Sequence, residues 1–179
     1  PYPLSFIDRA QYATLTKWLN NLTSHDLSKV DVSDCKSLDN WVDAIAAQTP
    51  IRITHSSGTS GRLSFLPRSE AEVRLTVENY CHMAEGFGDE PDVGANSKVP
   101  DMPLIWPGYR KGATESARLH DGFVKYVYDG DEAMIVYMSP DRVSADALSI
   151  GRRLQAGDAK GVQGRLNISP EIMALVEKA

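Results

Sequence analysis

Long apolar runs, paired cysteines and an excess of positive charge are all missing from this sequence of 179 residues. No segment approaches the roughly 18 apolar residues that a membrane-spanning helix needs, and no charged segment followed by an apolar one opens the chain. The two cysteines, Cys35 and Cys81, stand in no Cys-x-x-Cys or Cys/His spacing, which argues against a disulfide framework and a structural zinc site. We therefore predict a cytoplasmic protein with no membrane span and no metal ligands.

The charge balance is acidic, because 19 Lys and Arg residues stand against 24 Asp and Glu, a formal net charge of −5. A nucleic-acid-binding domain normally carries a concentrated basic face, so we expect no nucleic-acid partner and favour a small molecule. With 42% hydrophobic residues, the chain is large enough for one domain of two or three layers. Because it starts at Pro1 and stops at Ala179 inside an apolar helical pattern, we expect it to be part of a longer chain.

Residues 1–50 predict a helical segment. The apolar residues between Leu4 and Leu22 recur at helical spacing, which indicates one amphipathic helix or two short ones. Ser37 is suited to cap a second helix, whose apolar stripe ends before Pro50.

The pattern of residues 51–179 predicts an α/β portion with a mixed or parallel sheet flanked by helices. Together with the helical segment 1–50, this portion would form one incomplete domain. Strands are expected at 51–54, 63–66, 104–106, 123–128 and 134–138, the last of them well buried. Helices are expected from Ser69 to near Gly86, from Ser144 to Leu154 and after Ser169, with a loop over 89–103.

The most informative segment is the loop between the first two predicted strands, which is rich in hydroxyl groups and glycine. Two glycines allow successive backbone N–H groups to face one concavity, and four hydroxyls add donors without bulk, an arrangement that suits a polyphosphate. The loop residues that we predict to bind a phosphate ligand are Ser56, Ser57, Gly58, Thr59, Ser60, Gly61 and Arg62. A Ser/Gly-rich turn without a ligand is the alternative.

The local charge supports an anion site. No acidic residue occurs between Asp43 and Glu70, although this interval contains Arg52, His55, Arg62 and Arg68. The spacing is not that of a Walker A loop, since no lysine occurs from Ser37 to Met83, and the three-glycine pattern of a Rossmann loop is also missing.

The heptapeptide from Ser56 to Arg62 resembles the phosphate-binding motif of the adenylate-forming enzymes, the acyl-CoA synthetase and acyl-protein synthetase superfamily, which is written Ser-Gly-Thr-Thr-Gly followed by Lys or Arg. The preceding run from Pro50 to Ile53 and the helix after the second strand fit the same layout. Within the superfamily, the closest resemblance is to phenylacetate-CoA ligase and to the luciferase-type acyl-protein synthetases. The strong match covers about a dozen residues.

This resemblance implies ATP and Mg²⁺ as cofactors, a carboxylic acid as substrate and a thiol, amine or hydroxyl as acyl acceptor, with CoA as one candidate. The acid would attack the α-phosphate of ATP to give an acyl-adenylate and pyrophosphate. The hydroxyls of Ser57, Thr59 and Ser60 and the backbone of the two glycines would hold the β- and γ-phosphates. Arg62 would act as the catalytic residue by stabilising the charge that develops on pyrophosphate.

The sequence also departs from the family pattern. Leu63 and Ser64 stand where many members have Pro-Lys, so the mobile lysine of the motif has no counterpart. Residues 112–115 and 156–158 weakly resemble the segments that bind adenine and ribose in this family. We reject both matches because they follow the loop too closely in the sequence. We therefore expect the first portion of the large domain of an acid-activating ligase, which needs the remainder of its own chain for catalysis.

Two other classes of function remain as alternatives: a stand-alone phosphate-binding or protein-interaction module, and a hydrolase that uses a loop serine with His120 and Asp121. The hydrolase is disfavoured because adjacent His and Asp side chains rarely orient each other and no G-x-S-x-G motif occurs. The basic runs at 151–153 and 160–165 are assigned to a solvated helix end and loop, with a second anion surface as the alternative. The run from Trp106 to Gly112 is assigned to an exposed turn, with the lining of an acyl or nucleotide pocket as the alternative.

Overall fold

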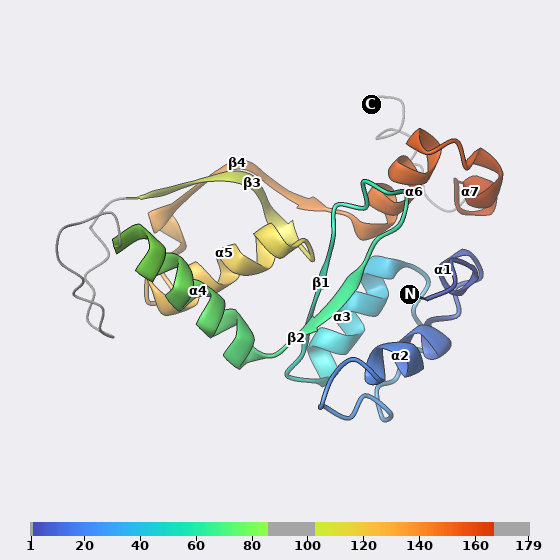
Figure 1. The fold of residues 1–179 in the computed structure, drawn as a ribbon, viewed down its shortest axis with the longest axis horizontal. Helices are drawn as coiled ribbons and strands as arrows, with labels where there is room; N and C mark the ends of the chain where they lie inside the picture. Colours follow the sequence, from blue (N-terminus) through green and yellow to red (C-terminus); the bar gives the residue numbers. More distant parts are fainter. Residues whose placement is uncertain (1, 86–102, 167–179) are drawn as a thin grey trace.

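The computed structural model describes residues 2–85 and 103–166, and within them the chain forms a mixed α/β architecture with two small sheets (Figure 1). Strands β1 and β2 pair antiparallel, whereas β3 and β4 pair parallel. The helices are α1 (Ser5–Asp8), α2 (Tyr12–Asn20), α3 (Leu38–Gln48), α4 (Glu70–Glu85), α5 (Glu115–Tyr126), α6 (Ala145–Gln155) and α7 (Ala159–Leu166), with a short 3₁₀ helix, η1 (Glu132–Met134). The strands are β1 (Arg52–His55), β2 (Phe65–Arg68), β3 (Leu104–Gly112) and β4 (Ile135–Val143).

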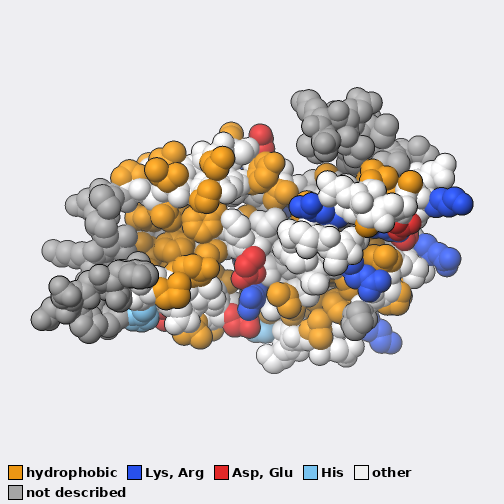
Figure 2. All heavy atoms as spheres, turned by 45° about the horizontal axis from the view of Figure 1, so that its top comes forward, with side chains coloured by type: hydrophobic (Ala, Val, Ile, Leu, Met, Phe, Trp, Pro, Cys, Tyr) orange, Lys and Arg blue, Asp and Glu red, His pale blue; other side chains and the backbone are white. Residues whose placement is uncertain are grey.

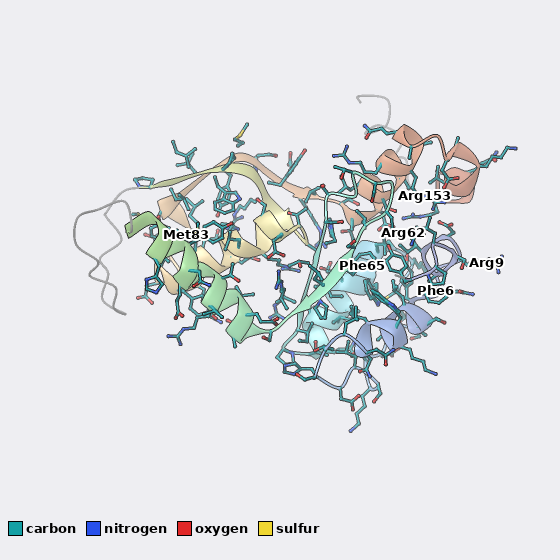
Figure 3. All side chains as sticks on the ribbon, in the orientation of Figure 1. Phe6, Arg9, Arg62, Phe65, Met83 and Arg153 are labelled. Atoms are coloured by element: carbon teal, nitrogen blue, oxygen red, sulfur yellow. The ribbon has the colours of Figure 1, made fainter. Side chains whose placement is uncertain are left out.

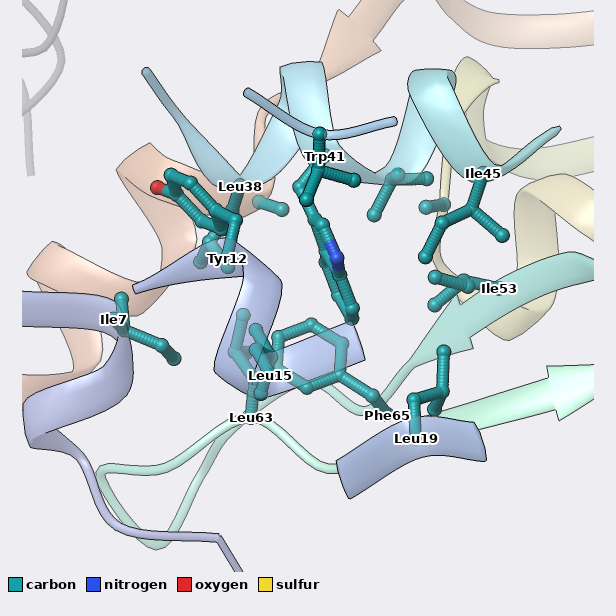
Figure 4. Close-up of a cluster of buried hydrophobic side chains, with 14 of the residues drawn as sticks. Ile7, Tyr12, Leu15, Leu19, Leu38, Trp41, Ile45, Ile53, Leu63 and Phe65 are labelled. Carbon is teal, nitrogen blue, oxygen red and sulfur yellow. The ribbon is translucent and has the colours of Figure 1, made fainter. Parts of the chain in front are cut away.

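The N-terminal helices and the β1–β2 hairpin share one hydrophobic core (Figure 4). Trp41 of α3 is fully buried in this core, and its indole Nε1 donates to the Thr16 hydroxyl at 2.8 Å. Phe65 of β2 packs edge-on against the Trp41 ring, with ring centroids 5.2 Å apart. Two short helices near the start of the chain are confirmed, as is the cap of α3, where the Ser37 hydroxyl accepts from the Asn40 N–H.

Strands β3 and β4 with the crossover helix α5 form a parallel β-α-β unit. The strand predicted over 123–128 is wrong, because residues 123–126 are the last turn of α5. The misleading residue is Gly122, which lies in the helix interior and not at a break. A Cβ atom placed there would lie 2.7 Å from Val77 Cγ2, so glycine allows α4 to pack closely against α5.

No described element covers one face of the β3–β4 sheet. α5 packs on the other face, and alternate side chains of the two strands therefore project to the surface (Figure 2). Val136 and Met138 are 53% and 76% exposed, so the expectation that this last strand is well buried is wrong. The predicted turn over 106–112 is also wrong, because these residues belong to β3 and pair with β4, with shifts in the pairing register.

Helices α6 and α7 complete the described chain and return to the N-terminal helices. Ser144 caps α6 as predicted, since its hydroxyl accepts from the Ala147 N–H. α7 was not predicted. The burial of Arg153 and Arg165 was not predicted either; Arg153 forms an ion pair with Asp8, and Arg165 forms one with Asp146. Figure 1 shows α6 and α7 beside α1, far along the sequence from it.

The two-stranded sheets meet where β1 ends. The His55 N–H donates to the Ala113 carbonyl at 2.7 Å, and His55 forms a parallel bridge with Thr114. The loop that follows β1 therefore starts next to the N-terminal end of α5. No helix of the described residues is long and apolar enough to cross a membrane. Residues 89–102 of the loop predicted over 89–103, and the helix predicted after Ser169, lie outside the described residues.

Candidate functional site

The loop between β1 and β2 is a closed turn shaped by its two glycines. Gly58 and Gly61 have φ angles of +68° and +80°, the left-handed region that glycine occupies without steric cost. The Gly61 N–H donates to the Gly58 carbonyl at 2.8 Å. At the base, the Ser56 N–H donates to the Ser64 carbonyl, and the Ser64 N–H donates to the Ser56 hydroxyl. Ser56 therefore closes the loop with its side chain.

The remaining hydroxyls of the loop face outward. Ser57, Thr59 and Ser60 are exposed, and none of their hydroxyls has a hydrogen-bond partner among the described residues. An anion at the loop would thus meet three available donors on a backbone turn.

The C-terminal end of the loop is held by the start of the chain. Leu63 is buried, and its carbonyl accepts from the Tyr2 hydroxyl at 2.7 Å. The Arg62 guanidinium lies over the Tyr2 ring, with its carbon 5.8 Å from the ring centroid. Burial raises the pKa of Tyr2 to about 12, so the hydroxyl stays protonated and remains a donor at neutral pH.

The other side of the loop rests on α6 through Arg152, which the sequence analysis assigned to a solvated helix end. The Arg152 Nε–H donates to the Ser57 carbonyl at 3.1 Å, and Arg152 Cγ would lie 3.5 Å from a Cβ atom on Gly58. A Cβ atom on Gly61 would lie 3.2 Å from Ala156 Cβ. Arg152 follows Ser57 by 95 residues, so no local pattern connects them. The only signal in the sequence was the pair of arginines in the last turn of a capped helix.

Two guanidinium groups give the loop its positive charge. Neither Arg62 nor Arg152 forms an ion pair with any residue in the described part of the chain, whereas the neighbouring Arg153 is neutralised by Asp8 and Asp158. Figure 3 shows Arg62 and Arg153 in the region between the loop and α1. Unpaired cations at an exposed turn attract anions over roughly a Debye length of about 8–10 Å.

The other basic residues of this interval do not serve the loop. Arg68 pairs with Glu115, and Arg52 donates to the carbonyls at the end of α3. His55 is buried beside Phe65, and its burial lowers its pKa, so it is neutral at pH 7. Its Nε2 atom has no hydrogen-bond partner within residues 2–85 and 103–166. Of the four basic residues between Asp43 and Glu70, Arg62 is therefore the one whose charge is placed at the loop.

A groove of about 800 Å³ adjoins the loop along α6. Its lining combines an apolar wall with a few polar side chains: Tyr109, Asp141, Arg142, Val143, Ser144, Ala147, Leu148, Gly151, Arg152, Leu154 and Gln155. Arg152 belongs to both the groove and the loop, since it lines the first and hydrogen-bonds the second.

The residues of the hydrolase alternative are not assembled. His120 is buried in α5, where its Nε2 contacts the Tyr137 hydroxyl and its Nδ1 lies 3.3 Å from Asp121. Within the described ranges, no histidine ring hydrogen-bonds a serine hydroxyl of the loop. Nor do the described residues contain a group of three or more His, Cys, Asp or Glu side chains suited to a metal ion.

We compared the chain with family models, with curated protein sequences and with solved structures, and none of the three comparisons gave a match.

Proposed function

We propose that this chain is the first portion of the large domain of an ATP-dependent ligase that activates a carboxylic acid as an acyl-adenylate. The observation that carries the proposal is the loop itself: two left-handed glycines, three exposed hydroxyls and two guanidinium groups that have no ion pair among the described residues. A polyphosphate needs this combination of donors and positive charge. The mixed α/β fold, with the loop inside a hairpin and a long helix after it, supports the same assignment.

Each residue has a role in this proposal. The hydroxyls of Ser57, Thr59 and Ser60 donate to the terminal phosphates of ATP, and the turn between the glycines brings the backbone close to them. Arg62 stabilises the charge on the departing pyrophosphate. Bound ATP supplies an electrophilic phosphorus that the carboxylate attacks. The acyl group would then pass from the adenylate to an acceptor, for which a thiol such as that of CoA is the leading candidate, with AMP as the leaving group.

The residues fit a phosphate group better than a protein-bound metal. No set of metal-ligating side chains occurs in the described part of the chain, so no residue here is assigned to Mg²⁺. Magnesium in nucleotide sites is often held largely by phosphate oxygens and water. We accordingly propose that Mg²⁺ enters with ATP.

Titration of the chain with inorganic pyrophosphate, by calorimetry, tests the loop directly. Gly61→Val should weaken binding by about tenfold or more, because its side chain meets Ala156 and strains the turn. Gly130→Val is the matched control, since Gly130 has a φ of +87° with open space around it and lies in a turn outside the loop. Equal pyrophosphate affinity in a folded Gly61→Val variant and the wild type would refute the loop as the phosphate site.

Catalysis is tested in the longest natural form of the chain, by incorporation of labelled pyrophosphate into ATP. The exchange should depend on added carboxylic acid, and Arg62→Ala should slow it by about 10- to 1,000-fold. Pyrophosphate binding without any acid-dependent exchange would instead favour a stand-alone phosphate-binding module.

A further inference from the structure

The groove along α6 opens beside the phosphate loop, and one arginine belongs to both. We propose that this groove binds the acid substrate, that the acid is a monocarboxylic acid with an extended apolar body, and that Arg152 holds its carboxylate next to the loop. This inference rests on the proposed function, because it places the acid of that reaction.

The walls of the groove favour an apolar ligand. The apolar part of the lining consists of Val143, Ala147, Leu148 and Leu154 with Tyr109 of β3. Small-molecule sites are typically apolar, with a few polar groups that fix orientation. From Ala147 to Gln155 the lining of α6 extends about 12 Å at 1.5 Å per residue. A volume of about 800 Å³ far exceeds what a two- or three-carbon acid would fill.

Charge sets the direction in which such an acid would lie. Arg142, before the start of α6, already pairs with Asp43 and Asp39, whereas Arg152, in the last turn of α6, has no ion pair among the described residues. The carboxylate is therefore expected at the Arg152 end, which is also the end that touches the loop. The body of the acid would extend from there toward the start of α6.

Arg152 has donors to spare for this role. Its guanidinium carries five N–H groups. Nε–H donates to the Ser57 carbonyl, and Nη1 donates to the Gln155 side chain at 2.9 Å. Three N–H groups therefore have no partner within the described residues, enough to hold a carboxylate through two parallel hydrogen bonds.

The lining also disfavours an amino acid as substrate. Among the described lining residues, Asp141 is the sole carboxylate, and it precedes α6, at the end away from Arg152. An α-ammonium group would lie next to the carboxylate that Arg152 holds, where the lining offers no negative partner. A buried or half-buried cation without a partner is costly.

The groove is tested by filling it. Gly151 lies inside α6 on the groove wall, and a Cβ atom there meets nothing within 4 Å, so Gly151→Leu adds bulk without backbone strain. Gly164→Leu in α7 is the matched control, since it makes the same change at an open helical position that does not line the groove. The measurement is calorimetric titration of the chain with octanoate, without nucleotide. Gly151→Leu should weaken octanoate binding by about tenfold or more, and Gly164→Leu should leave it within about twofold.

The carboxylate contact is tested with Arg152→Gln, which keeps a hydrogen-bond donor and removes the charge. Octanoate affinity should fall by about tenfold, whereas octan-1-ol affinity should change little, and Arg9→Gln serves as the control for the lost charge. Thermal unfolding of each variant shows whether it is folded.

The outcomes separate this inference from the proposed function. Absence of octanoate binding, equal binding by wild type and a folded Gly151→Leu variant, or equal affinity for octanoate and octanol would overturn the acid groove. Pyrophosphate titration of wild type and Gly151→Leu reports on the loop independently, because Gly151 does not contact it, whereas Arg152 belongs to both sites. If wild type and Gly151→Leu both bind pyrophosphate while the octanoate experiment fails, the loop assignment stands and the groove assignment falls.

Discussion

Replacing Tyr2 with phenylalanine tests whether the start of the chain holds the loop. The substitution removes only the hydroxyl that donates to the Leu63 carbonyl at 2.7 Å. It keeps the ring contacts, with centroids 5.1 Å from Trp18 and 5.5 Å from Phe65, and it keeps the ring under Arg62. The hydrogen bond is therefore perturbed with little change in packing.

The expected cost follows from the burial of both partners. A protein hydrogen bond contributes about 0.5–1.5 kcal/mol net, and a buried acceptor left without its donor costs about 1–3 kcal/mol. Tyr2 is 3% exposed and Leu63 is 1% exposed, so water does not readily replace the hydroxyl. We expect Tyr2→Phe to lower the free energy of unfolding at pH 7 by about 1–3 kcal/mol.

The same hydrogen bond has an alkaline consequence. Burial raises the pKa of Tyr2 to about 12 in the folded chain, from 10.0 as the ordinary value. The protonated hydroxyl therefore contributes its stability fully below pH 10, and this contribution is lost as the pH rises from 10 toward 12. Burial also raises the pKa of Tyr12, so some alkaline destabilisation should remain in Tyr2→Phe.

The assay is urea denaturation of wild type and Tyr2→Phe at pH 7 and at several values between pH 9 and 12, followed by tryptophan fluorescence. The variant should start lower and lose less stability across the alkaline range. A change at pH 7 below about 0.3 kcal/mol, together with parallel alkaline curves, would refute the claim that this hydroxyl anchors the loop.

Two further perturbations test other parts of the fold. Burial lowers the pKa of His55, so the neutral ring contributes stability above its ordinary pKa of 6.5, and this stability is lost as the pH falls below 6.5. His55→Leu should therefore reduce the fall in the free energy of unfolding between pH 7 and pH 5. An unchanged pH dependence of that free energy, measured by urea denaturation, would contradict this prediction. Arg165→Met leaves Asp146, which is 7% exposed, without its ion-pair partner, and should lower the free energy of unfolding by about 3–5 kcal/mol. The double variant with Asp146→Leu should recover much of this loss. Equal stability of the single and double variants would show that the unpaired buried carboxylate is not the cause.

The local chemistry of single residues allowed much of the fold to be predicted. Ser37 and Ser144 are helix caps in the structure because a hydroxyl before an apolar stripe satisfies an N–H group that the helix cannot. Two strands separated by a loop were predicted from apolar alternation before a Ser/Gly/Thr cluster and an apolar run after it, and these strands pair antiparallel in the structure. For the two caps, the decisive hydrogen bond joins residues three apart in the sequence.

The errors arise where a distant segment decides the structure. Gly122 suggested a break before a strand, but it is a contact point for Val77 of α4 inside α5. The exposure of Val136 and Met138 depends on which sheet face is covered, and composition does not encode that. For the candidate site, the shape of the loop was predictable from its glycines, whereas the contribution of Arg152 depends on the packing of α6 against the loop.

The supports of the loop come from opposite ends of the sequence: Tyr2 is 61 residues from Leu63, and Arg152 is 95 residues from Ser57. Contacts between residues so far apart in the sequence carry a large entropic cost of loop closure and therefore form late in folding. The turn should acquire its final shape only after both ends of the chain have docked. A fragment that begins at residue 51 would keep every residue of the turn and lose the hydroxyl beneath it. Anion binding at this turn would therefore report the completed assembly of the whole chain, and would in return stabilise it.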